Sequence, residues 1–385
     1  MPERETASGP ATDACAAVYL DYNATTPVRP AVRAAMLDVL AQTGNPSSVH
    51  MFGRQARQQR ETARGQVAAL VGVSPAQVVF TSGGTEANAQ ALATPEARWW
   101  VSAIEHESVR VAAAGDPDAL LPVTPDGVID LSALEARLEA APASPCPQVA
   151  LMLANNETGV IQPVAASAER VRAAGGRIHC DAIQAAGRIA VDFAALKVDS
   201  LSLSAHKLGG PQGVGALILR PDAEPPVLLR GGGQERGRRA GTENLAGIVG
   251  FGVAAVEALA ALSRQHVLAG WRDALEARLQ AAAPTACFFG TGAPRLPTTM
   301  CLAMPGVAAT TQVMALDLAG IAVSAGAACA SGSPRPSPVL RAMGVPESRA
   351  GEAIRVSFGW ASTQADLERF AAAWLALYRR LAAPA

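Results

Sequence analysis

The chain has 385 residues, half of them hydrophobic, and its formal net charge is −1. At roughly 100–200 residues per domain, this length predicts two or three domains with a sizeable core. The near-neutral charge excludes a basic surface for nucleic acid or membrane. Because there is no charge-free apolar run of about 18 residues, no membrane-spanning helix is expected.

The first 17 residues, Met1–Ala17, are small, polar and acidic. They lack the apolar centre of a signal peptide. We therefore expect residues 1–17 to form a flexible tail on a cytoplasmic protein.

Short β-rich runs then alternate with Ala-rich helical stretches such as Ala56–Val71 and Leu131–Ala140. This alternation predicts an α/β fold whose sheet is largely parallel and covered by helices on both faces. Polar residues follow several of the strands, at the edge where open α/β sheets bind ligands. The expected strands are Val78–Thr81, Trp99–Ile104, Val149–Ala154, Arg177–Asp181, Ser200–Ser204 and Val214–Leu219.

A long helical pattern from Leu245 to Ala283 follows, and after Pro284 come short strands and a final helix, Thr363–Leu381. We expect a large domain at residues 18–263 and a smaller α+β domain at 264–385. The first residues of the large domain are expected to pack beside the smaller one.

A glycine-rich turn occupies Phe80–Asn88, where a strand leads into a helix through Gly83 and Gly84. Backbone N–H groups at such a helix start bind anions, and glycine allows a phosphate to approach closely. An ordinary helix capped by Ser82 or Thr85 explains the same pattern equally well.

Lys197 and Lys207 are the two lysines of the chain, so they are the two candidates for chemistry that requires a primary side-chain amine. Lys207 follows the strand Ser200–Ser204 and faces the ligand edge, whereas Lys197 ends a short helix as a surface charge. Asp181 ends another strand. Its carboxylate could hold a protonated ring nitrogen of a cofactor, although a helix cap is the more common role of such a residue.

The six cysteines are scattered without a C-x-x-C pair, which indicates neither a disulfide framework nor a metal site. Cys329 lies among small residues, in a loop from which a thiolate could reach a substrate. Cys287 and Cys301 are expected in the core. Arg355 is a lone arginine within a strand, where it could bind a substrate carboxylate or form a structural ion pair.

These motifs together resemble the cysteine desulfurases of the NifS/IscS type. The resemblance runs from Tyr19 to near the end of the chain. It is carried by Tyr19–Pro27, Gly44–Ser48, Thr81–Glu86, Glu105-His106, Asn155–Gly159, Asp181 with Gln184, Ser204–Lys207, Arg230–Gly237, Ala240–Thr242 and the Cys329 loop. It implies the aspartate aminotransferase-like fold type I of pyridoxal phosphate enzymes. That fold has a mostly parallel, seven-stranded sheet between helices and a smaller α+β C-terminal domain.

The resemblance also implies a role for each matching residue. Lys207 forms a Schiff base with pyridoxal phosphate and removes the α-proton of L-cysteine, His106 acts as acid and base, and Cys329 takes the sulfur as a persulfide. Asn156 and Arg355 orient the substrate, and Thr242 is contributed by the other subunit of a homodimer. The implied cofactor contacts are Gly84, Thr85, His106, Asn156, Asp181, Gln184, Ser204, His206, Lys207 and Thr242.

The expected products are L-alanine and a persulfide that passes sulfur to an iron–sulfur scaffold or a thiolation protein. Two other readings remain open. One is a different fold type I enzyme, either a selenocysteine lyase or an aminotransferase, and an aminotransferase has no need for Cys329. The other is a catalytically silent scaffold, against which Lys207, Asp181 and His106 all argue.

Overall fold

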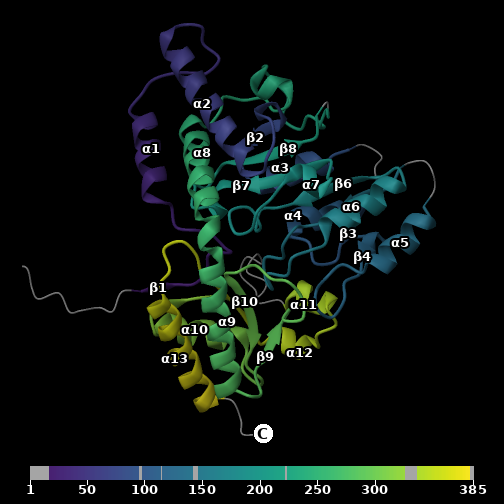
Figure 1. The fold of residues 1–385 in the computed structure, drawn as a ribbon, viewed down its shortest axis with the longest axis vertical. Coiled ribbons are helices and arrows are strands. Elements are labelled where there is room, and N and C mark those ends of the chain that lie inside the picture. Colours follow the sequence, from purple (N-terminus) through teal and green to yellow (C-terminus); the bar gives the residue numbers. More distant parts are fainter. Residues whose placement is uncertain are drawn as a thin grey trace, which may run out of the picture.

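A computed structural model describes residues 17–94, 98–113, 115–141, 146–221, 223–325 and 336–381. The predicted tail, residues 1–17, lies almost entirely outside these residues, and so does Cys329. In Figure 1 a larger upper part holds the main sheet and a smaller lower part holds the second sheet. The helices α8 (Leu245–Ala260) and α9 (Gln265–Ala282) run as a column through both parts.

The main sheet has seven strands in the spatial order β2-β8-β7-β6-β5-β3-β4. The strand β8 is antiparallel to both β2 and β7, and the other pairings are parallel. The predicted, mostly parallel sheet is therefore confirmed. Its strands are β2 (Val78–Thr81), β3 (Trp99–Ser102), β4 (Leu120–Leu121), β5 (Gln148–Ala150), β6 (Arg177–Asp181), β7 (Ser200–Ser204) and β8 (Gly215–Leu219).

Helices cover both faces of this sheet because successive strand residues point to opposite faces. In β8, Ala216 and Ile218 belong to the large core, whereas Leu217 and Leu219 pack on the other face. The large core includes residues of α2 (Met51–Leu70), α5 (Leu131–Glu139), α6 (Val164–Ala173), α7 (Phe193–Leu196) and α8. The opposite face is covered by α3 (Gly84–Leu92) and α4 (Glu107–Arg110).

The second sheet has four strands in the order β12-β13-β10-β9, paired antiparallel. Its strands are β9 (Cys287–Phe289), β10 (Thr299–Ala303), β12 (Ser324–Ala325) and β13 (Ala353–Ser357). The core beside it is formed with α9, α10 (Ala309–Leu318) and α13 (Gln364–Leu381). Two short helices, α11 (Pro338–Ala342) and α12 (Glu347–Ala350), pack toward β9 and β10 in a separate cluster.

The last helix, α13, is amphipathic, with buried residues at the three- and four-residue spacing of one helix face. Trp374 is fully buried and donates a hydrogen bond from Nε1 to Gln312 Oε1 at 3.1 Å. Truncation of such a buried tryptophan to alanine typically costs about 3–5 kcal/mol. This helix therefore anchors the end of the described chain.

The start of the described chain packs against the second sheet region. The strand β1 (Val18–Tyr19) pairs in parallel with β11 (Ile321–Ala322), and Asp21 bridges to Ser357. The division of the chain into domains at residues 263 and 264 stays a prediction.

One helical run is long and apolar enough by composition to cross a bilayer. It spans Leu245–Ala282, with a window of mean hydropathy 2.1 of which 44% is buried. We expect no membrane-spanning helix because the chain has no charge-free apolar run of about 18 residues, and Glu257 interrupts the apolar run found here. The helix α8 packs closely against α1 (Pro30–Leu40) and α2 and buries half of its length, as a core helix does.

Candidate active site

The pairing register brings the predicted site to one edge of the main sheet. Asp181, the last residue of β6, lies opposite Ser202 of β7, and Ser204, the last residue of β7, lies opposite Gly215. Because β6 and β7 are parallel, Asp181 and Ser204 lie at the same carboxyl edge. Lys207 follows three residues after Ser204, at the end of a single 3-10 turn. The predicted placement of these residues is thus confirmed.

Lys207 is tied to the N-terminal segment of the chain. Its Nζ donates to the backbone oxygens of Asn23 at 2.5 Å and Ala24 at 2.8 Å. The Thr26 hydroxyl in turn donates to the Lys207 backbone oxygen at 3.1 Å. The other lysine, Lys197, is exposed and pairs with Glu169. Of the two lysines, Lys207 is thus the one that lies at the carboxyl edge of the sheet, and its role as the functional amine stays a prediction.

Asn23 was not predicted as a site residue. Its backbone oxygen also accepts from Gln184 Nε2 at 3.0 Å, and its side chain donates to the Asn156 backbone oxygen at 3.0 Å. Asn23 thus connects three segments of the site. The motif Tyr19–Pro27 indicated that this segment matters, but a backbone acceptor leaves no signature in the sequence.

Asp181 is a buried carboxylate with two fixed donors. Its Oδ1 accepts from the Ile183 backbone N–H at 2.9 Å, and its Oδ2 accepts from Asn88 Nδ2 at 2.8 Å. Burial raises the pKa of Asp181, and these two hydrogen bonds and the charges of His106 and Lys207 oppose the rise. A buried carboxylate in this setting favours a cationic partner group.

His106 and Asp181 share a buried network centred on Asn88, a second residue that was not predicted. The Nδ2 of Asn88 donates to Ser108 Oγ at 2.9 Å as well as to Asp181, and Ser108 Oγ lies 2.8 Å from His106 Nδ1. Asn88 Oδ1 lies 3.1 Å from His179 Nε2. Asn88 was part of the glycine-turn motif, but its partners lie 20 and more residues away, so spacing could not identify them.

The contacts of the two histidines differ. The Ser108 backbone N–H donates to His106 Nδ1 at 3.1 Å, so Nδ1 acts as an acceptor and Nε2 is the ring nitrogen that carries a proton. Burial lowers the pKa of His179 to about 3, so that ring is neutral and donates to Asn88. His179 therefore orients the Asn88 amide rather than supplying charge.

A second buried carboxyl group, Glu105, lies beside Asp181. Its Oε1 accepts from the Met152 backbone N–H, and its Oε2 has no partner among the described residues. Burial, with the charge of Asp181 second, raises the pKa of Glu105 well above its usual range. Burial beside the charge of Asp181 thus favours the neutral, protonated form of Glu105.

The helix α3 begins beside the end of β7. Its N-cap is Gly83, and no side chain caps the helix, so capping by Ser82 or Thr85 is wrong. A Cβ on Gly84 would lie 2.2 Å from Ile183 Cδ1 and 3.4 Å from the Ser204 Cβ. A side chain at Gly84 would therefore have to displace Ile183, and Thr85 is exposed at the helix start.

His206 lies next to Lys207 and is partly buried. Its Nδ1 is 3.2 Å from the Thr25 hydroxyl. Burial, followed by the nearby charge of Lys207, lowers the pKa of His206 to about 4. His206 is therefore neutral near pH 7. The Ser204 side chain lies beside the start of α3, and its hydroxyl and the first N–H groups of that helix are donors that suit a phosphate group.

Arg355 reaches the site from β13 of the second sheet. Its Nη1 donates to the Asn156 backbone oxygen at 3.0 Å, and its Nη2 pairs with Asp21 Oδ1 at 2.7 Å. The ion pair considered as the alternative role is therefore present. The buried Nε–H of Arg355 has no partner among the described residues.

Two predicted site residues are not brought into this cluster. Thr242 is exposed and lies in a separate pocket with Thr81 and Ser82. Cys329 lies outside the described residues. Of the other cysteines, Cys301 is fully buried as expected, but Cys287 is only partly buried because it begins the edge strand β9.

Comparisons with known proteins agree with this geometry. The model of the family "Aminotransferase class-V" matches residues 18–370. A cysteine desulfurase of Cereibacter sphaeroides is 43% identical over 366 residues, which cover 91% of this chain and 93% of the relative. A cysteine desulfurase of Gluconacetobacter diazotrophicus is 42% identical, with 92% of this chain and 91% of the relative covered.

A solved structure shows the same fold. The NifS-like protein from Rickettsia africae ESF-5 has a TM-score of 0.87 and 32% sequence identity, covering 94% of this chain and 99% of that one. The resemblance to NifS-type cysteine desulfurases and the expected fold are thereby confirmed. The chain belongs to the class-V aminotransferase family.

Proposed function

We propose that the chain is a pyridoxal phosphate-dependent cysteine desulfurase, which removes sulfur from L-cysteine and leaves L-alanine. The observation that carries the proposal is that a primary amine, Lys207, and a buried carboxylate, Asp181, both lie at the carboxyl ends of two adjacent strands. The names of the relatives favour this activity over that of an aminotransferase or a selenocysteine lyase.

The residues at this edge fit the cofactor. Pyridoxal phosphate, when bound, supplies an aromatic system that stabilises negative charge on the α-carbon of the substrate. Asp181 would hold the protonated ring nitrogen, and Gln184 would contact the ring oxygen. The phosphate would be held by Ser204 and His206, together with the start of α3 at Gly84 and Thr85.

Lys207 and His106 carry the proton transfers. The Asn23 and Ala24 carbonyl groups hold Lys207 Nζ at the carboxyl edge. We assign to Lys207 the removal of the α-proton of the substrate. His106, whose Nδ1 is fixed by Ser108, exposes Nε2 as the atom that can give or take a proton.

Arg355 and Asn156 orient the substrate. A buried guanidinium group binds a carboxylate strongly, because the interaction combines charge with directed hydrogen bonds. The Nε–H of Arg355, which has no partner among the described residues, is one of the donors that remain for this contact. Asp21 and the Asn156 carbonyl hold the rest of the guanidinium in place.

Cys329 receives the sulfur. Its thiolate sulfur forms a bond to the substrate sulfur while the C–S bond of the substrate breaks. The electron pair of that bond stays on the β-carbon, which takes up a proton to give L-alanine. The persulfide on Cys329 then passes its outer sulfur to an iron–sulfur scaffold or a thiolation protein.

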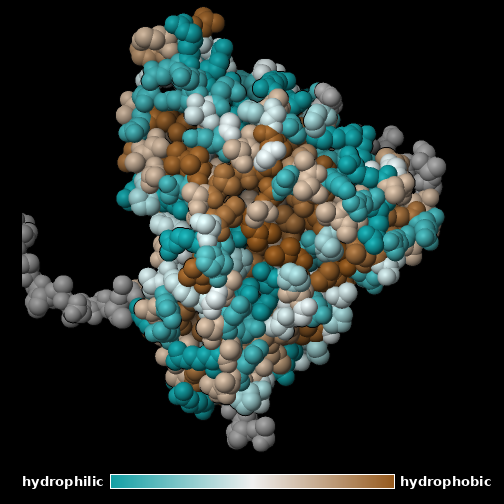
Figure 2. Space-filling view, in the orientation of Figure 1, coloured by the Kyte–Doolittle hydropathy of each residue, from teal (hydrophilic) through white to brown (hydrophobic). Residues whose placement is uncertain are grey.

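We further propose that the protein works as a cytoplasmic homodimer. Figure 2 shows hydrophobic side chains gathered over the part of the molecule that holds the main sheet. The start of α2 also exposes Met51 and Phe52, 61% and 53% exposed. Exposed apolar surface of this kind marks interaction sites. Thr242, itself exposed, is assigned to the site of the partner subunit.

The test is an assay of alanine and sulfide from L-cysteine, with added thiol, for the cofactor-loaded protein. We expect Lys207→Ala to abolish both products, whereas Lys197→Ala, the matched change of the other lysine, leaves both unchanged. Cys329→Ala is expected to lose sulfide transfer. Wild-type rates in Lys207→Ala would overturn the assignment of the amine, and wild-type rates in Cys329→Ala would overturn the persulfide step alone.

A further inference from the structure

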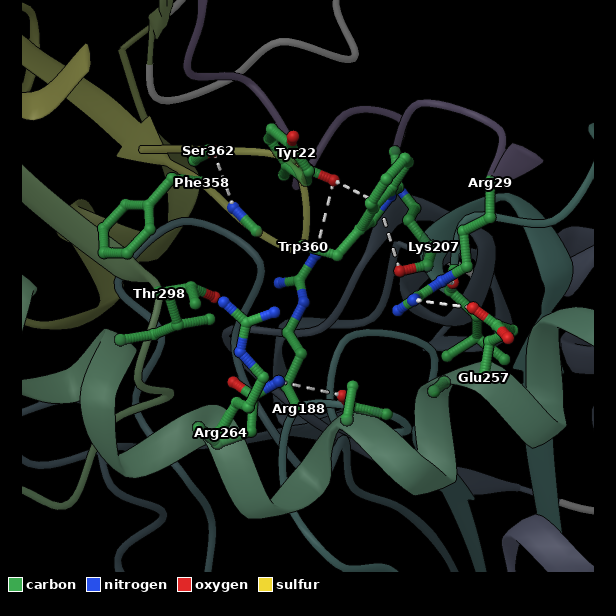
Figure 3. Close-up of a pocket in the computed structure, with 18 residues that line it drawn as sticks. Tyr22, Arg29, Arg188, Lys207, Glu257, Arg264, Thr298, Phe358, Trp360 and Ser362 are labelled. Atoms are coloured by element: carbon green, nitrogen blue, oxygen red, sulfur yellow. Dashed lines mark hydrogen bonds and ion pairs between the residues drawn. The ribbon is translucent and has the colours of Figure 1, made fainter. Parts of the chain in front are cut away.

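A cavity of about 270 Å³ lies on the α8–α9 side of Lys207, where these two helices join. It is enclosed by the N-terminal segment at Tyr22–Arg29, the turn Ala261–Arg264 and the segment at Phe358–Ser362 (Figure 3). Lys207 is the one residue that this cavity shares with the proposed catalytic site; Asp181, His106 and Ser204 do not line it. It is therefore a distinct compartment that the proposed reaction does not use.

The cavity is lined by more positive than negative charge. Besides Lys207, three arginines, Arg29, Arg188 and Arg264, line it with a single carboxylate, Glu257. Arg29 lies over the Trp360 ring at 5.3 Å and pairs with Glu257 at 3.6 Å, so this carboxylate is already matched. The charges of the other two arginines remain to be balanced.

Arg188 is a buried cation without a counter-charge among the described residues. It is 7% exposed, and its guanidinium donates to neutral acceptors, which are the Asn23 side chain, Gln184 Oε1 at 3.0 Å and the Tyr22 backbone oxygen at 3.3 Å. Burial, with the charge of Arg355 second, lowers the pKa of Arg188 to about 9. A buried charge is costly unless it is paired, and an anion beside it would offset that cost.

Arg264 faces the same space from the opposite side. Arg264 is an exposed residue that makes no side-chain hydrogen bond or ion pair with the residues that the structure describes, and in Figure 3 its guanidinium points toward that of Arg188. Two guanidinium groups turned toward one space repel each other unless an anion lies between them. The position thus favours an oxyanion, which accepts hydrogen bonds from both.

Two buried polar atoms of the cavity wall also lack partners among the described residues. They are the Thr298 hydroxyl, on a residue 1% exposed, and the side-chain oxygen of Gln265. The Thr298 hydroxyl can donate to an anion, whereas the Gln265 oxygen needs a donor. A hydrogen phosphate group offers both acceptor oxygens and a proton, which a dicarboxylate does not.

We propose that this cavity is a second ligand site, which binds a small phosphate-bearing anion between Arg188, Arg264 and Thr298. The volume is slightly below the range of about 300–1,000 Å³ that is usual for ligand pockets, which limits the ligand to a small one. Bound there, the ligand contacts elements that pack with both sheets, so it ties the upper and lower parts together.

The test is calorimetric titration of inorganic phosphate into the pyridoxal phosphate-loaded protein, with ionic strength held constant by chloride. The loaded protein is used so that the phosphate subsite of the cofactor is already filled. We expect saturable binding that Arg264→Gln weakens about tenfold or more, as loss of a charge-assisted hydrogen bond should. Thr298→Val should weaken it severalfold without changing the volume of the side chain.

Arg278→Gln is the matched control, because Arg278 is an exposed arginine of α9 outside this cavity. It is expected to leave phosphate binding unchanged. Three outcomes would overturn the proposal: no saturable binding of phosphate, equal weakening by Arg264→Gln and Arg278→Gln, or saturable binding of succinate in place of phosphate. A rise in Tm with phosphate that is lost in Arg264→Gln would support it independently.

Discussion

Glu157 provides a direct test of the electrostatics beside the proposed site. It is 4% exposed, and its Oε2 accepts a hydrogen bond from the Ser337 hydroxyl at 2.5 Å. Ser337 also caps α11, accepting from the Leu340 backbone N–H at 3.0 Å. Burial raises the pKa of Glu157 to about 7, and the Ser337 hydrogen bond and the charge of Arg355 only partly oppose this rise.

The raised pKa makes the native state less stable as the pH rises. Between the ordinary value of 4.5 and the native value of about 7, the native state retains a proton that the unfolded chain has lost. The stabilisation is therefore fully present below pH ~4.5 and lost as the pH passes ~7. At 1.36 kcal/mol per pKa unit, the loss from pH 5.5 to 8 is about 2 kcal/mol.

Glu157→Gln mimics the protonated side chain and should abolish this pH dependence. Between pH 5.5 and pH 8, the free energy of unfolding of the variant should rise by about 2 kcal/mol relative to that of the wild type. At about 2.1 cal/mol/K per residue, this gain is a relative rise of roughly 2–3 °C in Tm. Thermal unfolding at both pH values measures it, because other titrating groups cancel in the difference.

Glu139→Gln is the matched control, since Glu139 is an exposed glutamate at the end of α5. Its Tm should follow that of the wild type at both pH values. Parallel curves for Glu157→Gln and the wild type between pH 5.5 and pH 8 would refute the raised pKa of Glu157.

Two further changes test the buried contacts around the site. Asn88→Ala removes a hydrogen-bond donor from Asp181, so we expect kcat to fall about tenfold and the pH–rate profile to shift. An unchanged pH–rate profile would contradict a positioning role of Asn88. Glu235→Gln leaves Arg64, which Glu235 binds with two hydrogen bonds of 2.7 Å each, as a poorly compensated buried charge. Urea unfolding should show that Glu235→Gln lowers the free energy of unfolding by about 3–5 kcal/mol. The control Glu61→Gln, at the exposed side of the same arginine, should lower it by about 0–1 kcal/mol. Equal losses in the two variants would refute this reasoning.

The strands were predicted better than the helices. The bounds of β6 and β7 agree with the sequence pattern because polar residues at the carboxyl edge end both strands sharply. The helix α2 begins at Met51 rather than Ala56, since His50 caps it by accepting from the Gly53 N–H at 3.3 Å. The single helix predicted over residues 245–283 is divided by the 3-10 turn Ala261–Arg264, which contains no Gly or Pro to mark it.

The placement of candidate site residues was predictable where a polar side chain follows a strand. Lys207 and Asp181 could be identified in this way, because strand ends leave a pattern in the sequence. Asn23 and Asn88 could not, because their contacts join residues 20 to 334 positions apart and several of them involve backbone oxygens. Such contacts depend on tertiary structure, which no local pattern encodes.

The N-terminal segment that holds Lys207 has a consequence for protein synthesis. The Asn23 N–H donates to the Ser357 hydroxyl at 2.9 Å, and β1 pairs with β11. During translation the segment emerges first, yet its partner at Ser357 is made 334 residues later. At about 5–20 residues per second, the segment waits roughly 20–70 s for that partner. The nascent chain therefore completes the surroundings of Lys207 only after Ser357 has been made.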